Sequence, residues 1–70
     1  MKDKFDLSKH VGEVVILYQG ESFTRGTLVG VNDYTYILSN AETDDGSVGD
    51  EVSVLIELVN KVRTFNAIRQ

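Results

Sequence analysis

The sequence predicts a mainly β fold, in which a short N-terminal helix precedes a strongly bent, five-stranded antiparallel sheet that forms a small open barrel. Three observations support this prediction. From residue 14 onward, β-branched and aromatic residues gather in five short segments. The connections between these segments are short and rich in turn residues. Two glycines, Gly26 and Gly30, lie inside the second segment, and glycine within a strand is typical of a bulge or a bend.

The first residues of the chain predict a short helix of about two or three turns. Asp3 is a candidate N-cap, Phe5 and Leu7 supply an apolar side, and Gly12 is a natural C-terminal stop. His10 lies near the end of this helix, where a positive charge interacts favourably with the helix dipole. We therefore expect His10 to have a structural role and not a catalytic one.

Five strands are expected to follow the helix. Short turns between them predict that consecutive strands pair antiparallel. Asn60, between the last two strands, is predicted to be a turn residue in the left-handed conformation. The connection before the fourth strand is acidic, but it lacks the ligand spacing of a calcium-binding EF-hand, so we expect it to be a solubilising loop. The predicted strands span residues 14–18, 23–31, 34–42, 51–59 and 61–68.

Composition excludes several classes of protein. The 70 residues include no cysteine and one histidine, so neither a disulfide framework nor a Cys/His zinc site is possible. We expect no metal and no cofactor. The chain contains no Ser/His/Asp or Cys/His set, and we expect no enzymatic activity. A domain of this size buries only about 60% of the surface that its unfolded chain exposes, which predicts stabilisation by partner subunits.

The whole chain, 1–70, is expected to form a single domain. Its longest apolar run, Val14 to Tyr18, is far too short to cross a bilayer, and its first ten residues do not have the pattern of a signal peptide. We therefore expect a soluble, cytoplasmic protein. The expected parts are the helix at 1–12, three strands within 13–42, the acidic loop at 43–50 and two strands within 51–68.

Charge is distributed unevenly along the chain. Residues 1–25 carry four bases and four acids, residues 26–60 carry seven acids and no lysine or arginine, and residues 61–70 carry three bases and no acid. The net charge of −4 is therefore the sum of a strongly acidic middle and a basic end. An acidic chain is an unusual binder of nucleic acid, because lysine and arginine supply most of the non-specific affinity for phosphates.

The stretch VVILYQGESFTRGTLVGVNDYTYILSNAE, residues 14–42, resembles the first motif of the Sm/LSm family of small barrels, including its bacterial Hfq branch. In that motif, an apolar strand and a polar turn precede a polar-Gly-apolar-apolar-Gly run. An Asp/Asn, an aromatic residue, a small residue and a further apolar strand then follow. Here Gly26 and Gly30 are the two glycines and Tyr34 is the aromatic residue. The second motif of the family is represented only by LVNK at 58–61.

The resemblance implies a homo-oligomeric ring of about five to seven subunits, in which the fourth strand of one subunit pairs with the fifth strand of the next. Such a ring binds single-stranded RNA, or DNA, through loops that line its pore, and acts in nucleic-acid processing or chaperoning. An aromatic or flat side chain in these loops stacks on a base. The residues that match the pore loops are Asn32, Asp33, Tyr34, Thr35, Asn60 and Lys61.

Purely structural roles are the alternative to nucleic-acid binding for residues in this region. Tyr34 and Tyr36 share one face of a strand, so one is expected to pack in the barrel while the other is exposed. Lys61 and Arg63 also share a face, which predicts either a basic patch repeated around the ring or a solvated strand surface. Two other functions stay open as well: a structural ring that contacts only proteins, and a monomeric SH3-like adaptor domain.

Overall fold

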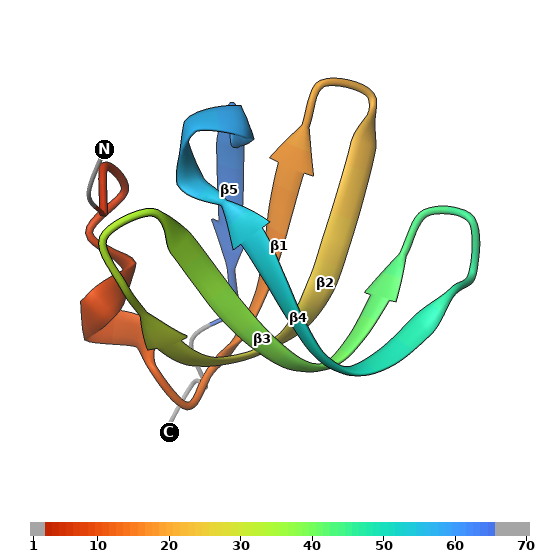
Figure 1. Ribbon diagram of the computed structural model, residues 1–70, viewed down its shortest axis with the longest axis horizontal. Coiled ribbons are helices and arrows are strands. Elements are labelled where there is room, and N and C mark those ends of the chain that lie inside the picture. Colours follow the sequence, from red (N-terminus) through yellow and green to blue (C-terminus); the bar gives the residue numbers. More distant parts are fainter. Residues whose placement is uncertain (1–2, 66–70) are drawn as a thin grey trace.

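The computed structural model describes residues 3–65 and contains a single antiparallel sheet. Along this sheet the strands lie in the order β4-β3-β2-β1-β5 (Figure 1). The predicted pairing of consecutive strands is therefore wrong for the last two, because β5 pairs with β1 and lies at the edge opposite β4. The sheet is therefore an open barrel, which confirms the predicted mainly β fold. The strands are β1 (Val14–Gln19), β2 (Ser22–Val31), β3 (Thr35–Thr43), β4 (Val48–Leu55) and β5 (Lys61–Thr64).

Alternate side chains of the strands form one hydrophobic core. In β1, Val15 and Leu17 are buried, whereas Val14 on the opposite face is exposed. This alternation follows from the two-residue period of a strand. The sheet curves around its buried face, so one layer of backbone encloses the core. The buried hydrophobic residues are Leu7, Val15, Leu17, Leu28, Tyr36, Leu38, Ala41, Val54, Ile56 and Val59.

The curvature arises where the pairing of β2 with β3 is interrupted. Register shifts occur at Gly26 and at Val29, and each is a β-bulge that bends the sheet. Opposite Gly26, β3 contains one extra residue, and Asn40 there has a φ angle of 51°. A Cβ atom on Gly26 would lie 2.9 Å from the carbonyl oxygen of Ser39 and 3.0 Å from the Cα of Ala41. The predicted bend at Gly26 is thus confirmed, and only glycine permits so close an approach of the two strands.

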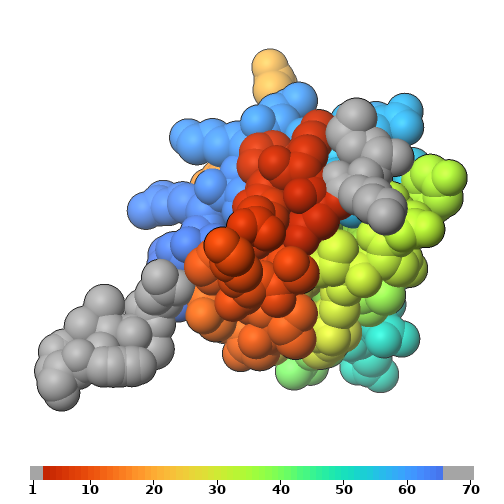
Figure 2. Space-filling model, turned by 90° about the vertical axis from the view of Figure 1, so that its left-hand side faces the viewer, coloured from red at the N-terminus to blue at the C-terminus, as the bar shows by residue number. Residues whose placement is uncertain are grey.

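The N-terminal segment forms one short 3-10 helix, so the predicted helix of two or three turns is wrong. This helix, η1, spans Leu7–His10 and follows Asp6, which has a φ angle of 58°. A left-handed residue does not continue a right-handed helix, so η1 begins only after Asp6. Leu7 is buried in the core. In Figure 2 the segment lies across one face of the molecule, between the β5 region and the β2–β3 turn.

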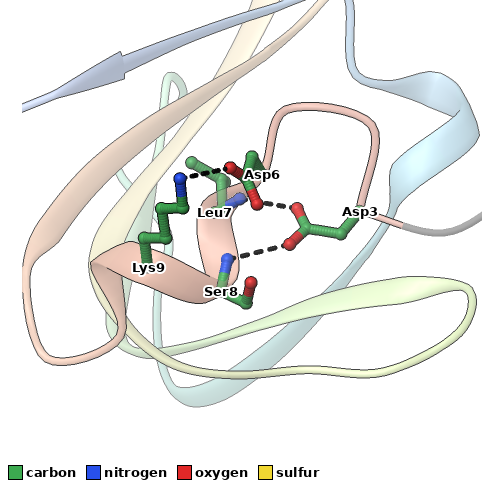
Figure 3. Close-up of polar contacts among 5 residues, drawn as sticks. All are labelled: Asp3, Asp6, Leu7, Ser8 and Lys9. Carbon is green, nitrogen blue, oxygen red and sulfur yellow. Dashed lines mark hydrogen bonds and ion pairs between the residues drawn. The ribbon is translucent and has the colours of Figure 1, made fainter.

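Asp3 caps this helix and joins it to the sheet. Its Oδ1 accepts a hydrogen bond from the Leu7 amide at 2.6 Å, and its Oδ2 accepts one from the Ser8 amide at 2.8 Å (Figure 3). The hydroxyl of Tyr36, which lies in β3, donates to Asp3 Oδ1 at 2.9 Å and accepts from the Phe5 amide at 3.4 Å. The Tyr36 ring is fully buried, so these bonds fix the N-terminal segment to the middle of the sheet.

This contact shifts the pKa values of both side chains. Burial raises the pKa of the Tyr36 hydroxyl well above its usual value, and the hydrogen bond to the Asp3 carboxylate raises it further. Burial also raises the pKa of Asp3, but the hydrogen bonds from Ser8, Leu7 and Tyr36 together outweigh it. The net effect lowers the pKa of Asp3. Near neutral pH, Asp3 is therefore the charged acceptor and Tyr36 the donor.

The connection between β3 and β4 is shorter than the predicted acidic loop at 43–50. Because β4 begins at Val48, only residues 44–47 lie between the strands. Asp45 Oδ1 accepts hydrogen bonds from the Thr43 hydroxyl at 2.5 Å and from the Ser47 amide at 2.9 Å. The Thr43 bond, followed by those from Ser47, lowers the pKa of Asp45 to about 2. Asp45 is therefore an ionised acceptor that shapes a hairpin turn.

The fourth strand also ends earlier than the predicted 51–59. It stops at Leu55, and the next residues form a second 3-10 helix, η2 (Ile56–Leu58), that leads to β5. The side chains of Ile56 and Val59 are buried in the core, so the chain turns toward the core after the end of β4. Of the predicted last strand, residues 66–68 lie outside the described residues. Within the described part, no helix is long and apolar enough to span a membrane.

Replacement of Gly26 by alanine is expected to destabilise the fold by about 1–3 kcal/mol, because the added methyl group overlaps backbone atoms of β3 that have no room to move away. Gly30→Ala is the matched control, since the nearest atom to its added Cβ is 4.0 Å away. Urea unfolding of both variants, followed by circular dichroism at one protein concentration, measures the difference. Equal losses of stability at the two positions would contradict the bend at Gly26.

Replacement of Asp3 by asparagine is expected to lower the free energy of unfolding by about 1–2 kcal/mol at pH 7, because an amide replaces the carboxylate acceptor. The pKa of Asp3 is lowered in the folded state, so its stabilisation is present above the ordinary carboxyl range and is lost as the pH falls through the folded pKa. The difference in the free energy of unfolding between the wild type and Asp3→Asn should therefore decrease below about pH 4.

Asp6→Asn provides the control for this experiment. Asp6 is exposed and pairs with Lys9 at 3.0 Å on the surface, and asparagine tolerates its left-handed backbone. We expect this change to alter stability by less than about 0.5 kcal/mol, because surface ion pairs contribute little. An equal pH dependence in the two variants would show that the Asp3 contacts do not anchor the segment.

Candidate nucleic-acid interface

A tight turn between β2 and β3 contains four of the six predicted site residues. The Oδ1 of Asn32 accepts hydrogen bonds from the Thr35 hydroxyl at 2.7 Å, the Thr35 amide at 2.9 Å and the Tyr34 amide at 3.2 Å. The Asn32 amide in turn donates to the Thr35 carbonyl at 2.9 Å. This is an Asx turn, in which a side chain takes the place of a backbone acceptor. Asn32 and Thr35 therefore shape the turn, and Asp33 and Tyr34 are exposed at its tip.

The two tyrosines near this turn have opposite surroundings. Tyr36 is completely buried, whereas Tyr34 is 66% exposed. The two tyrosines are two positions apart, but Tyr34 lies in the turn, before the first residue of β3, and is not held by the strand pairing. The structure thus separates a packing tyrosine from an exposed one. An exposed aromatic ring on a fixed turn is the side-chain type that stacks on a nucleobase.

The β2–β3 turn is hydrogen-bonded to the connection between β4 and β5. The backbone amide of Ile56, the first residue of η2, donates to the Tyr34 carbonyl at 2.9 Å. Leu55 lies opposite Thr35 in the pairing of β3 with β4 and is half exposed. The backbone at Tyr34 is therefore bonded on both sides, within its own turn and to η2, and the tip has a fixed position relative to the barrel.

The other two predicted site residues lie at the start of β5, beside the β1–β2 hairpin. The Asn60 side chain accepts a short hydrogen bond from the Gly20 amide, and the Asn60 amide donates to the Tyr18 carbonyl at 2.8 Å. Asn60 does not have a positive φ angle, so the predicted left-handed turn residue is wrong. Its side chain instead joins β5 to the hairpin turn. Lys61 is exposed, with its Nζ 5.6 Å from the centre of the Tyr18 ring.

The two halves of the predicted site make separate contacts in the chain. The Tyr34 turn is bonded to η2, and Asn60 is bonded to the end of β1. Figure 2 shows the N-terminal segment between the β5 region and the β2–β3 turn. A single chain therefore presents one exposed aromatic turn and, on the other side of that segment, a basic strand.

Sequence reasoning predicted the shared face of Lys61 and Arg63 but missed the aromatic side chains that lie beside them on the outer face of β1, β2 and β5. The rings of Tyr18 and Phe23 lie opposite each other in the pairing, with centroids 6.3 Å apart. Lys61 lies over Tyr18, and the Arg63 guanidinium is 5.6 Å from the centre of the Phe65 ring. The two-residue alternation along each strand predicts a shared face, but the register that aligns them is visible only in the fold.

Two further features of the surface contain none of the predicted site residues. A shallow groove crosses β1, β2 and β3, and the ion pair between Arg25 and Glu42, 2.9 Å long, lies within it. His10 Nδ1 lies 2.8 Å from Glu13 Oε1, consistent with the structural role expected for this histidine. Among residues 3–65, no group of three or more acidic or histidine side chains has the arrangement of a metal site. The groove is lined by Val14, Arg25, Gly26, Thr27, Asn40, Glu42 and Phe65.

Comparison of the sequence with known protein families and with curated proteins finds no match.

Proposed function

We propose that the chain assembles into a homo-oligomeric Sm-like ring, through pairing of β4 with β5 of the next copy, and that the ring binds single-stranded RNA or DNA through the Tyr34 turns. The observation that carries this proposal is the exposure of the Tyr34 ring on a turn fixed by four hydrogen bonds in itself and one to η2. Because the backbone of this turn is already fixed, little of its conformational freedom is lost when a base stacks on the exposed ring, so the turn is suited to binding.

The open edges of the sheet support the ring. Within the described residues, β4 pairs only with β3, and β5 pairs only with β1. An unpaired edge is a template for addition of a further strand, and proteins usually cover it. Pairing between copies would cover both edges at once and would compensate for the small core of a short chain. It would also repeat the Tyr34 turn and the Lys61 side chain around one axis.

The alternative is an assembly ring that contacts only proteins. The acidic composition favours this alternative, because residues 26–60 carry seven acids and no lysine or arginine. Of the basic residues near the barrel surface, Arg25 is already paired with Glu42. On β5, Lys61 and Arg63 share one exposed face and are the bases available there to bind nucleic acid. The two proposals differ in whether any oligonucleotide binds at low salt.

Replacement of Tyr34 by alanine is expected to weaken binding of labelled oligo-U or oligo-A by about tenfold, since stacking contributes about 1–3 kcal/mol per base. Tyr34→Phe keeps the ring and should bind like the wild type. Fluorescence anisotropy at several salt concentrations measures both, and affinity should fall as salt increases. Equal binding by Tyr34→Ala and the wild type would contradict the stacking role. No binding of RNA or DNA at low salt would favour the protein-only ring.

A further inference from the structure

The fold places the acidic and the basic parts of the sequence on opposite edges of the sheet. β4 lies in the acidic middle of the chain and carries Asp50 and Glu51, whereas β5 carries Lys61 and Arg63. All four side chains are exposed. Among residues 3–65 the ion pairs join other groups, so no ion pair between described residues involves these four charges, and Lys61 and Arg63 lie over the rings of Tyr18 and Phe65.

The face on which each charge lies follows from burial. In β4, Val52 and Val54 turn toward the core, so Glu51 and Ser53 lie on the outer face. In β5, Val62 is partly buried and packs against the core, so Lys61 and Arg63 lie on the outer face. The outer face therefore carries the acid Glu51 at one edge of the sheet and the bases Lys61 and Arg63 at the other, while Val52 and Val54 of β4 and Val62 of β5 turn toward the core.

From this arrangement we propose that the contact between β4 of one copy and β5 of the next is selected by a cross-strand ion pair between Glu51 and Arg63. In an antiparallel pair, the alignment that places Val52 opposite Val62 on the inner face places Glu51 opposite Arg63 on the outer face. Apolar side chains then meet on one face and opposite charges on the other, which is the favourable pairing for neighbouring strands.

The same charges act against symmetric dimers. In a dimer formed by two β4 edges, the acids Asp50 and Glu51 of one copy would lie close to those of the other. In a dimer formed by two β5 edges, the bases Lys61 and Arg63 would lie close to their counterparts. Like charges opposite each other destabilise a strand pair. Only the head-to-tail arrangement relieves this repulsion, and a repeated head-to-tail contact closes into a ring when its rotation permits. This inference rests on the proposed ring and adds the residues that select the contact.

Charge reversal tests the pair, with native mass spectrometry of the full chain at micromolar concentration as the readout. The wild type should appear at a multiple of 7.8 kDa. Glu51→Arg and Arg63→Glu, each alone, place like charges at every contact and should shift the mass toward the monomer. The double variant should restore the assembly. An equal mixture of the two single variants should assemble as well where the ring has an even number of subunits, because the two variants then alternate and each supplies the charge that the other needs.

Two controls make the result specific. Glu51→Arg combined with Lys61→Glu changes the same strands by the same charges, but Lys61 lies opposite Ser53 in the proposed alignment, so this double variant should not recover assembly to the same extent. Glu21→Lys, in the β1–β2 turn, makes the same change of net charge as Glu51→Arg without altering a residue of β4 or β5, and should assemble like the wild type. Far-ultraviolet circular dichroism checks that each variant is folded.

The outcomes separate this inference from the proposed function. Assembly of both single variants like the wild type, or equal recovery by the two double variants, would overturn the Glu51–Arg63 pair and leave the ring intact. A ring that responds to charge reversal but binds no oligonucleotide would support the pair and overturn the nucleic-acid proposal. A monomeric wild type would overturn both.

Discussion

The close approach of β2 and β3 at Gly26 is the constraint on which the rest of the structure depends. At this point the backbone of one strand lies where a side chain of the other would be, and β3 accommodates an extra residue by turning Asn40 into the left-handed conformation. Bulges increase the local bend of a sheet. Because the sheet bends here, five short strands enclose one core, and β4 and β5 come to lie at its open edges.

The second constraint is the buried hydroxyl of Tyr36. A buried polar group needs a partner, and the Asp3 carboxylate and the Phe5 amide supply it. The N-terminal segment is consequently fixed across one face of the barrel (Figure 2). Two residues earlier, the backbone of Tyr34 is bonded to η2 while its ring is exposed. Residues 34–36 thus bond the N-terminal segment to the sheet through Tyr36 and expose the aromatic side chain of Tyr34 to solvent.

Much of the fold could be predicted from the sequence because strands have a local signature. Runs of β-branched residues with short turns located all five strands, and an interior glycine located the bend. The limits of β4 could not be predicted in this way. Its apolar side chains continue through Ile56 and Val59, and the change from strand to 3-10 helix depends on how the chain must turn to reach β5 beside β1. The left-handed φ angle of Asp6, which shortens the N-terminal helix, likewise depends on contacts made in the folded state.

The site could be predicted only in part. The Asn-Asp-Tyr-Thr sequence indicated a turn, and the structure shows how Asn32 closes it. The sequence could not decide which of Tyr34 and Tyr36 is buried, since both lie on one face of an ideal strand. Asn60 was expected to shape its own turn, but its side chain joins β5 to a residue forty positions earlier. Such contacts between distant segments follow from topology, and no local pattern encodes them.

The proposed ring requires that the open edges of this sheet pair with one another between copies of the chain. Hydrogen–deuterium exchange at micromolar and at much lower protein concentration tests it most directly. We predict that the amides of β4 and β5 that are not bonded to β3 or β1 are protected in the concentrated protein and become unprotected on dilution, while amides of β2 do not change. Rapid exchange of those edge amides at both concentrations would contradict the account.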